Sequence, residues 1–344
     1  MLNDDYANFE LCMKSRPHVV ILGAGASCAA IPNGDKNGQK ISAMKGFIDK
    51  LKMTDIIQSL NLSTSSNNLE DIYMEMDERE DCSNAKMELE RRIEQYFSTF
   101  QIPDNPTVYD FLILSLRKKD FIATFNWDPL LVQAYDRCHK ITKDLPELGF
   151  LHGTVAIGLC KKDKRAGQIG TQCSVCGKNF HRIPLLYPVK EKDYVSNPFI
   201  ADSWRLLTAY LKTAYMITIF GYSAPSSDVA AVGMLKKAWG DVHQRNLEQI
   251  EIIDIQPKES VIQSWTDFIH THHYQVIDNL FDSYIGKFPR RTCDVLFDNT
   301  MNVKWMYGNK GFKSNMSFDD IKNYLNFLLA DEKKSGILND PYIE

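Results

Sequence analysis

The sequence has no apolar run long enough to span a bilayer, so a transmembrane protein is not expected. Its first residues, Met1 to Asp5, lack the basic-then-apolar order of a secretory signal peptide. The formal net charge is only −4, which argues against a protein that coats nucleic acid directly. Most of the 8 cysteines are scattered through apolar or helical segments, so no disulfide framework is expected. We expect a cytoplasmic protein whose 344 residues form one large or two modest domains.

The first glycine-rich turn also lacks two signatures, the third glycine of G-x-G-x-x-G and the Lys-Ser/Thr of a P-loop. What is present is a buried strand over 18–22, followed at once by Gly-Ala-Gly-Ala-Ser over 23–27. The glycines let the backbone turn tightly, and the helix expected next aims its first N–H groups at the same place. One interpretation is a strand–turn–helix without a ligand. The other is a pyrophosphate site that uses Gly23, Ala24, Gly25 and Ser27.

A second buried strand, over 121–125, ends in Asn126, Asp128 and Pro129. Asp followed by Pro is typical of a helix start, with Asp as N-cap and Pro at the first helical position. Because open α/β sheets bind ligands at the carboxyl ends of their strands, Asn126 and Asp128 are candidate site residues. The alternative is local, since Asn and Asp also favour turns and caps for their own sake.

Three further segments end in polar residues: a short strand at 150–153 with His152, a strand at 215–220 followed by Gly221 and Ser223, and a strand at 249–255 with Asp254. Ser226, Ser227 and Asp228 are N-cap candidates for a helix over 229–239. The alternation of buried strands and helices predicts an α/β fold with a doubly wound, Rossmann-like parallel sheet.

Residues 40–102 interrupt this alternation with three apolar stripes at helical spacing, so we expect a helical insertion there. We expect a catalytic domain at 1–290, which includes this insertion and a small Cys-containing lobe at 154–192. The segment 291–344 is then a C-terminal tail with one helix near 318–330. Its aromatic residues are candidates for assembly or partner contacts, although such side chains more often belong to the core: Phe297, Trp305, Tyr307 and Phe312.

Together, the strand ends offer what a dinucleotide needs. Glycine turns and Ser223 suit phosphates, and Asp254 suits the two hydroxyls of a ribose. Asn126 and Asp128 suit a carboxamide or a second ribose. His152 adds a group that titrates near neutrality.

This ordered set resembles the sirtuin family of NAD-consuming proteins over about residues 18–280. The resemblance is carried by five motifs: Gly23–Ser27 with Ile31-Pro32, Thr124-Phe125-Asn126-Trp127-Asp128, His152-Gly153, Gly221-Tyr222-Ser223, and Asp254. It implies NAD+ binding by Gly23, Ala24, Gly25, Ser27, Gly221, Ser223 and Asp254. It also implies that Asn126, Asp128 and His152 are the catalytic residues.

Two features separate the chain from the deacylases of that family. Asn33-Gly34-Asp35 stands where deacylases have Asp-Phe-Arg after Ile-Pro. The long insertion is similar to that of the branch found in bacterial antiphage defence, which implies an NAD+ hydrolase that depletes NAD+. The alternatives are an NAD-dependent protein deacylase and a non-catalytic module that senses NAD or ADP-ribose.

The resemblance also implies a zinc module after the His-Gly motif. Cys173 and Cys176 look like one Cys-x-x-Cys pair, and Cys160 stands where the other pair is expected. His181 can complete a structural site of three Cys and one His. The alternative is a loop that has lost its metal.

For the hydrolase, our hypothesis is that Asp128 holds the carboxamide and that Asn126 fixes the ribose hydroxyls and the attacking water. His152, as a neutral imidazole, then accepts a proton from a ribose hydroxyl or from that water. The expected partners are NAD+, further copies of the chain in a homo-oligomer, and a P-loop DNA-translocase or helicase ATPase or other defence subunit. No membrane and no direct nucleic-acid partner are expected.

Overall fold

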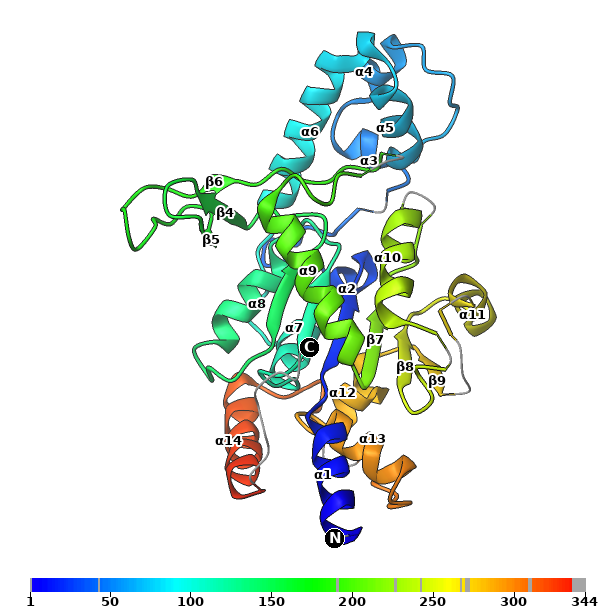
Figure 1. Ribbon diagram of the computed structural model, residues 1–344. Coiled ribbons are helices and arrows are strands. Elements are labelled where there is room, and N and C mark those ends of the chain that lie inside the picture. Colours follow the sequence, from blue (N-terminus) through cyan, green and yellow to red (C-terminus); the bar gives the residue numbers. More distant parts are fainter. Residues whose placement is uncertain are drawn as a thin grey trace.

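The computed structural model describes residues 2–42, 44–189, 192–225, 228–241, 243–266, 268–269, 273–308 and 311–335 (Figure 1). None of the described helices combines the length and apolar character that crossing a bilayer requires.

The centre of the molecule is a six-stranded sheet in which every neighbouring pair is parallel. Its order is β3-β2-β1-β7-β8-β9. The strands are β1 (His18–Leu22), β2 (Phe121–Thr124), β3 (Glu147–Phe150), β7 (Met216–Phe220), β8 (Gln249–Ile253) and β9 (Tyr274–Ile277). Their β-branched and aromatic runs suit strands covered on both faces. The predicted doubly wound parallel sheet is therefore confirmed.

Successive residues of the central strand β1 belong to the two hydrophobic cores on opposite faces of the sheet. Val20 and Leu22 join a core with α2 (Ala24–Ala30), α7 (Val108–Leu114) and α8 (Leu130–Cys138). Val19 and Ile21 join a second core on the opposite face. The helices of that face are α9 (Pro198–Thr213), α10 (Val229–Trp239) and α11 (Lys258–Trp265). This alternation follows from the two-residue period of a strand and places helices on both faces.

Two strands end earlier in the structure than predicted. β3 ends at Phe150, so His152 and Gly153 lie in the turn that follows, where Gly153 has a φ of +76°. β8 ends at Ile253, so Asp254 is the first residue after the strand. Both corrections leave these polar residues at the carboxyl edge of the sheet.

The segment after α2 forms a helical lobe at the carboxyl end of the sheet, at the top of Figure 1. It consists of α3 (Phe47–Lys50), α4 (Thr54–Ser59), α5 (Leu69–Asp77), η1 (Glu80–Cys82) and α6 (Ser83–Ser98). Its apolar side chains, including Phe47 and Ile93, belong to the same core as α7 and α8. The lobe is therefore packed onto the sheet domain through a shared core.

A second, three-stranded antiparallel sheet projects to one side of the molecule in Figure 1. Its strands are β4 (Ile157–Cys160), β5 (Arg165–Gln168) and β6 (His181–Arg182).

The amino end of the main sheet is covered by α1 (Leu2–Ser15), η3 (Leu280–Asp282), α12 (Tyr284–Lys287) and α13 (Thr292–Thr300). The last described helix, α14 (Phe318–Ser335), is held by Arg290, whose guanidinium binds Glu332 at 2.5 Å and Asp144 at 2.9 Å.

The four aromatic residues of the tail that were named as contact candidates divide into two pairs. Phe297 and Phe312 are buried, whereas the side chains of Trp305 and Tyr307 are 72% and 84% exposed. The first pair is thus core, and only the second pair is available for contact with another molecule.

Candidate functional site

A cavity of about 210 Å³ lies at the carboxyl ends of β1, β2 and β7. Eight of the predicted site residues line it: Gly23, Ala24, Ser27, Asn126, Asp128, His152, Gly221 and Ser223. They come from four segments far apart in the sequence, which meet because the strands are parallel and their carboxyl ends share one edge.

Gly25 and Asp254, the other two, make contacts within the protein. The Gly25 N–H donates to the carbonyl of Gly221 at 2.9 Å, and a Cβ on Gly25 would lie 2.7 Å from the Gly221 Cα. Gly221 itself has a φ of +61°. The glycines therefore let the turns after β1 and β7 pack backbone against backbone. Asp254 accepts the N–H of Gln256 at 2.8 Å and is not among the cavity-lining residues.

A buried hydrogen-bond network fixes Asn126. Its Nδ2 donates to the Gly23 carbonyl at 2.8 Å, to Ser27 Oγ at 2.9 Å and to the Tyr109 hydroxyl at 3.3 Å. Since all these contacts are made by the nitrogen, the orientation of the amide is defined. Asn126 Oδ1 is then the atom of this side chain that can meet a ligand.

Ser27 connects Asn126 to Asp128. Its Oγ donates to Asp128 Oδ2 at 2.7 Å and lies 2.7 Å from the Tyr109 hydroxyl. A hydroxyl has one donor and two acceptor positions, and Asp128, Asn126 and Tyr109 together use them. In this arrangement Ser27 holds two site residues in place, which differs from the predicted contact with a pyrophosphate.

Asp128 makes a hydrogen bond to the backbone next to it in the chain and also lines the cavity. Its Oδ1 accepts the N–H of Leu130 at 3.0 Å, but α8 begins at Leu130 with Pro129 in the N-cap position, so the predicted N-cap at Asp128 is one residue too early. The side chain also lines the cavity, and burial raises the pKa of this carboxyl. The hydrogen bond to Leu130 and a place in the cavity wall are therefore compatible.

His152 lies in the turn after β3, with its ring edge-on to Phe125 at a centroid distance of 4.8 Å. Burial lowers the pKa of His152 to about 3, which Lys192 reinforces and the Asp228 carboxylate opposes. The imidazole is thus neutral at physiological pH, the form in which a histidine accepts a proton.

Several residues of the cavity were not predicted. Tyr109 from α7 holds Asn126 and Ser27, whereas Lys192 and Asp228 form a buried ion pair in the cavity wall. Asp228 was predicted only as an N-cap. It does precede α10 but makes no capping hydrogen bond, and the other two N-cap candidates, Ser226 and Ser227, lie outside the described residues.

The helical lobe and the segment leading to it supply a further part of the wall that the sequence did not indicate. The residues concerned are Ile41, Ser42, Met44, Glu70 and Phe97. Helical periodicity identifies the inner face of such a segment but not what that face covers.

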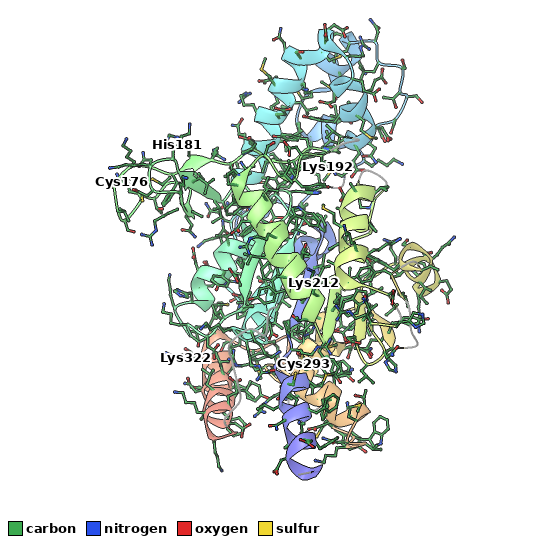
Figure 2. The ribbon with its side chains drawn as sticks, in the orientation of Figure 1. Cys176, His181, Lys192, Lys212, Cys293 and Lys322 are labelled. Carbon is green, nitrogen blue, oxygen red and sulfur yellow. The ribbon has the colours of Figure 1, made fainter. Side chains whose placement is uncertain are left out.

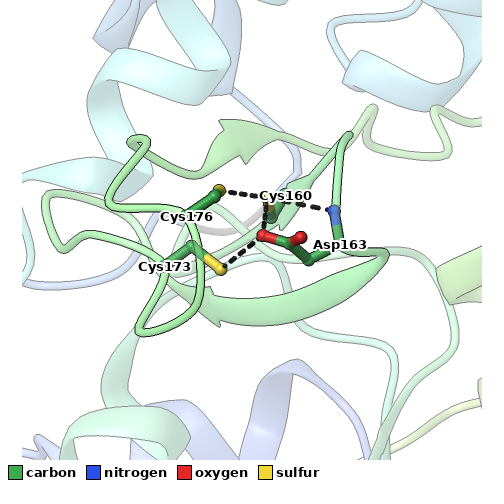
Figure 3. Close-up of side chains that lie close together, drawn as sticks. All are labelled: Cys160, Asp163, Cys173 and Cys176. Atoms are coloured by element: carbon green, nitrogen blue, oxygen red, sulfur yellow. Dashed lines mark hydrogen bonds between the residues drawn. The ribbon is translucent and has the colours of Figure 1, made fainter.

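The small sheet carries a cluster of sulfur and oxygen ligands (Figure 3). One ligand atom each from Cys160, Asp163, Cys173 and Cys176 lies within 4.8 Å of all the others. The Sγ atoms of Cys160 and Cys176 are 3.4 Å apart, and Asp163 Oδ2 lies 3.2 Å from the Sγ of Cys173. A tetrahedral zinc site with bonds of about 2.3 Å places its ligand atoms roughly 3.8 Å apart. The donor set therefore fits a zinc ion.

His181, the predicted fourth ligand, is not part of this cluster. It lies on β6 with an exposed side chain, and Figure 2 shows it apart from Cys176. Asp163 takes its place because the turn after β4 brings the Asp163 N–H to within 3.4 Å of Cys160 Sγ. In the sequence, the Cys-x-x-Asp spacing of Cys160 and Asp163 was the one signal that could have identified Asp163 as a ligand.

No protein-family model and no curated protein matches this chain. Among solved structures, it is similar to one of a Sir2 enzyme, with 13% identity and a TM-score of 0.40 over 88% of this chain and 100% of the other. A Sir2 homologue mutant with ADP-ribose has 14% identity and a TM-score of 0.38 over 87% and 99%. A Sir2 homologue with NAD has 14% identity and a TM-score of 0.36 over 86% and 94%. Similarities with such low identities and TM-scores say nothing about function. The fold class is defined by the strand order of the sheet itself.

Proposed function

We propose that this protein is an NAD+ hydrolase, which cleaves the bond between nicotinamide and ribose. In chain order, the strands of the main sheet follow the pattern 3-2-1-4-5-6, and β1 and β7 flank the point where the order reverses. Open sheets of this order bind dinucleotides in the crevice at that point. The observation that carries the proposal is the cavity there, which collects Asn126, Asp128 and His152 beside two glycine turns.

In this proposal, the two turns meet the phosphates. Gly23 and Ala24 line the cavity on one side, and Gly221 and Ser223 line it on the other. Backbone N–H groups and a serine hydroxyl are the usual donors to phosphate oxygens. Asp254, just beyond β8, is proposed to bind the ribose that extends outside the cavity.

Asn126 and Asp128 are proposed to bind the nicotinamide half. The carboxyl of Asp128 holds the carboxamide, and Oδ1 of Asn126 accepts hydrogen bonds from the ribose hydroxyls or from the attacking water. The C1′–N bond breaks with its electron pair leaving on nicotinamide, through an oxocarbenium-like state as in other glycosyl transfers. Water adds to C1′, His152 accepts its proton, and the products are ADP-ribose and nicotinamide.

Water is the proposed acceptor rather than an acyl-lysine. The cavity is bounded on the lobe side by Ile41, Met44 and Phe97 as well as by the strand ends. These apolar side chains line the cavity on that side. After Ile31-Pro32, the chain also lacks the Asp-Phe-Arg sequence that deacylases of the sirtuin family have.

The proposal is tested by incubating the protein in its native assembly with NAD+, with and without an acetylated peptide, and measuring nicotinamide. We expect release without the peptide. Release only with the peptide would instead identify a deacylase, and tight binding without any release would identify a sensing module.

Zinc is proposed to have a structural role. Cys160, Asp163, Cys173 and Cys176 would surround it with four protein ligands, as in closed structural sites. A bound ion there would join the turn after β4 to the loop before β6, away from the residues that line the cavity.

We further propose that the reaction serves antiphage defence by depleting NAD+. A freely active NAD+ hydrolase would harm the cell that makes it, so control through a homo-oligomer and a partner such as a P-loop DNA-translocase ATPase is expected. The exposed Trp305 and Tyr307 are proposed contact residues. Light scattering should give a mass above that of one chain. A strict monomer with full activity and no toxicity on expression would contradict this proposal.

A further inference from the structure

The carboxylate of Asp228 is turned into the cavity wall instead of capping its helix. It precedes α10 without a capping hydrogen bond, and the residue is only 4% exposed. Its Oδ2 accepts the Tyr222 hydroxyl at 2.9 Å, and Oδ1 is paired with Lys192 Nζ, whose side chain is 3% exposed. A buried carboxylate needs such partners to remain charged.

The third group at this carboxylate is His152. Its Nε2 lies 3.6 Å from Asp228 Oδ1, just beyond hydrogen-bond distance. Within the described part of the chain, this buried nitrogen has no hydrogen-bond partner. An unpartnered buried polar atom is costly, so a shift of less than 1 Å that lets Nε2–H meet Oδ1 is favourable.

Among the residues that the structure describes, Asp228 offers the carboxylate that lies beside Nε2. Phe125 and Tyr194 cover the ring, with the Tyr194 centroid 6.1 Å away. Lys192 is a cation, and the Tyr222 hydroxyl already donates to Asp228. Because Nε2 is enclosed in this way, Nδ1 is the ring nitrogen that remains for a ligand in the cavity.

We propose that Asp228 is a positioning residue for His152: it accepts Nε2–H, selects that tautomer and leaves Nδ1 as the base. This inference rests on the proposed function, in which Nδ1 takes one proton from the attacking water. The ring then carries a proton on each nitrogen, and the Asp228 carboxylate stabilises the imidazolium until the Nδ1 proton leaves to solvent. Lys192 and Tyr222 hold the carboxylate in position.

The two possible roles of Asp228, as a partner of Lys192 alone or as a positioning residue for His152, lead to different expected results. If Asp228 serves only to neutralise Lys192, then a variant that removes both charges should recover the kcat that is lost when only the Asp228 charge is removed. If Asp228 acts on His152, the double variant remains impaired because the acceptor of Nε2–H is still altered.

The experiment compares Asp228→Asn with the double variant Lys192→Met/Asp228→Asn. Glu332→Gln is the matched control, since it weakens a buried ion pair with Arg290 outside the cavity. The first readout is long-range ¹H–¹⁵N NMR of histidine-labelled protein, with the His152 signal assigned by its loss in His152→Gln. We expect a neutral Nε2–H tautomer in the wild-type protein and loss of this preference in both Asp228 variants, but not in the control.

The second readout is the pH profile of NAD+ cleavage. Both Asp228 variants should lose about 10²-fold or more in kcat with little change in KM. In Asp228→Asn, the acid limb should move to lower pH because the carboxylate that favours the imidazolium has been removed while Lys192 remains. The control should keep the wild-type profile.

An Nδ1–H tautomer in the wild-type protein, or a double variant with wild-type kcat, would overturn the inference. Absence of NAD+ cleavage by the wild-type protein in its native assembly would instead refute the proposed function. The NMR result decides the position of the proton in either case, so the two failures are distinguishable.

Discussion

Replacing Asn126 with alanine should abolish nearly all nicotinamide release while the protein stays folded. The three contacts of Nδ2 orient the amide, and Oδ1 is the atom that we propose meets the ribose hydroxyl or the water. Loss of one such preorganised polar group typically costs about 10²–10³ in kcat. The measurement is nicotinamide release per folded molecule, with folding checked by circular dichroism and thermal melting.

Asn197→Ala is a matched control for this prediction. Asn197 caps α9, with Oδ1 accepting the N–H groups of Phe199 and Ile200, and it is not among the cavity-lining residues. Its loss should lower the free energy of unfolding by about 1 kcal/mol and leave turnover unchanged. An Asn126→Ala protein that still hydrolyses NAD+ at the wild-type rate would show that Asn126 is only a turn residue.

The second large effect is expected at the cysteine cluster. Cys173→Ser should lose zinc and should unfold or aggregate, because metal binding and folding share one free energy, of about 10–16 kcal/mol for structural zinc in small domains. Elemental analysis should find about one zinc per chain in the wild-type protein and almost none in this variant.

Three further variants identify the ligands of this site. Asp163→Ala should weaken zinc binding, since Asp163 Oδ2 lies among the three sulfur atoms. His181→Ala and Cys12→Ser should retain the metal, because His181 is exposed outside the cluster and Cys12 is an exposed residue of α1. A fully active wild-type sample without stoichiometric metal would remove zinc from the account.

The fold could be predicted well from the sequence for a simple physical reason. The run Val19–Leu22 is apolar on both faces, and Ile217–Phe220 has Thr218 as its one polar residue; such runs are typical of strands covered by helices on both sides. Parallel strands then bring their carboxyl ends together. Asn126, His152 and Gly221 could therefore be placed at one edge without coordinates.

What could not be predicted concerns contacts between residues distant in sequence. Asp228 has the pattern of an N-cap, and only the folded chain brings Lys192 and His152 to its carboxylate. Gly25 has the pattern of a phosphate turn, yet its N–H meets Gly221 instead. The spacing of the ligands in the sequence favours His181, but it does not show that the turn after β4 brings Asp163 to the three cysteines.

The lobe illustrates the same limit on a larger scale. Its amphipathic stripes predict helices, but the first stripe is divided between the short helices α3 and α4. Nothing in the periodicity indicates that Phe97 would reach the cavity at the sheet edge.

The most direct test of the central claim is the fate of water during the reaction. NAD+ is incubated with the protein in ¹⁸O-labelled water without any peptide, and ADP-ribose is analysed by mass spectrometry. Unlabelled ADP-ribose in the same water controls for exchange at the anomeric carbon. For an NAD+ hydrolase, we expect nicotinamide together with ADP-ribose that carries one ¹⁸O atom beyond the exchange control. Intact NAD+ after prolonged incubation with the folded protein in its native assembly, or ADP-ribose formed only when an acyl peptide is added, would contradict the proposed function.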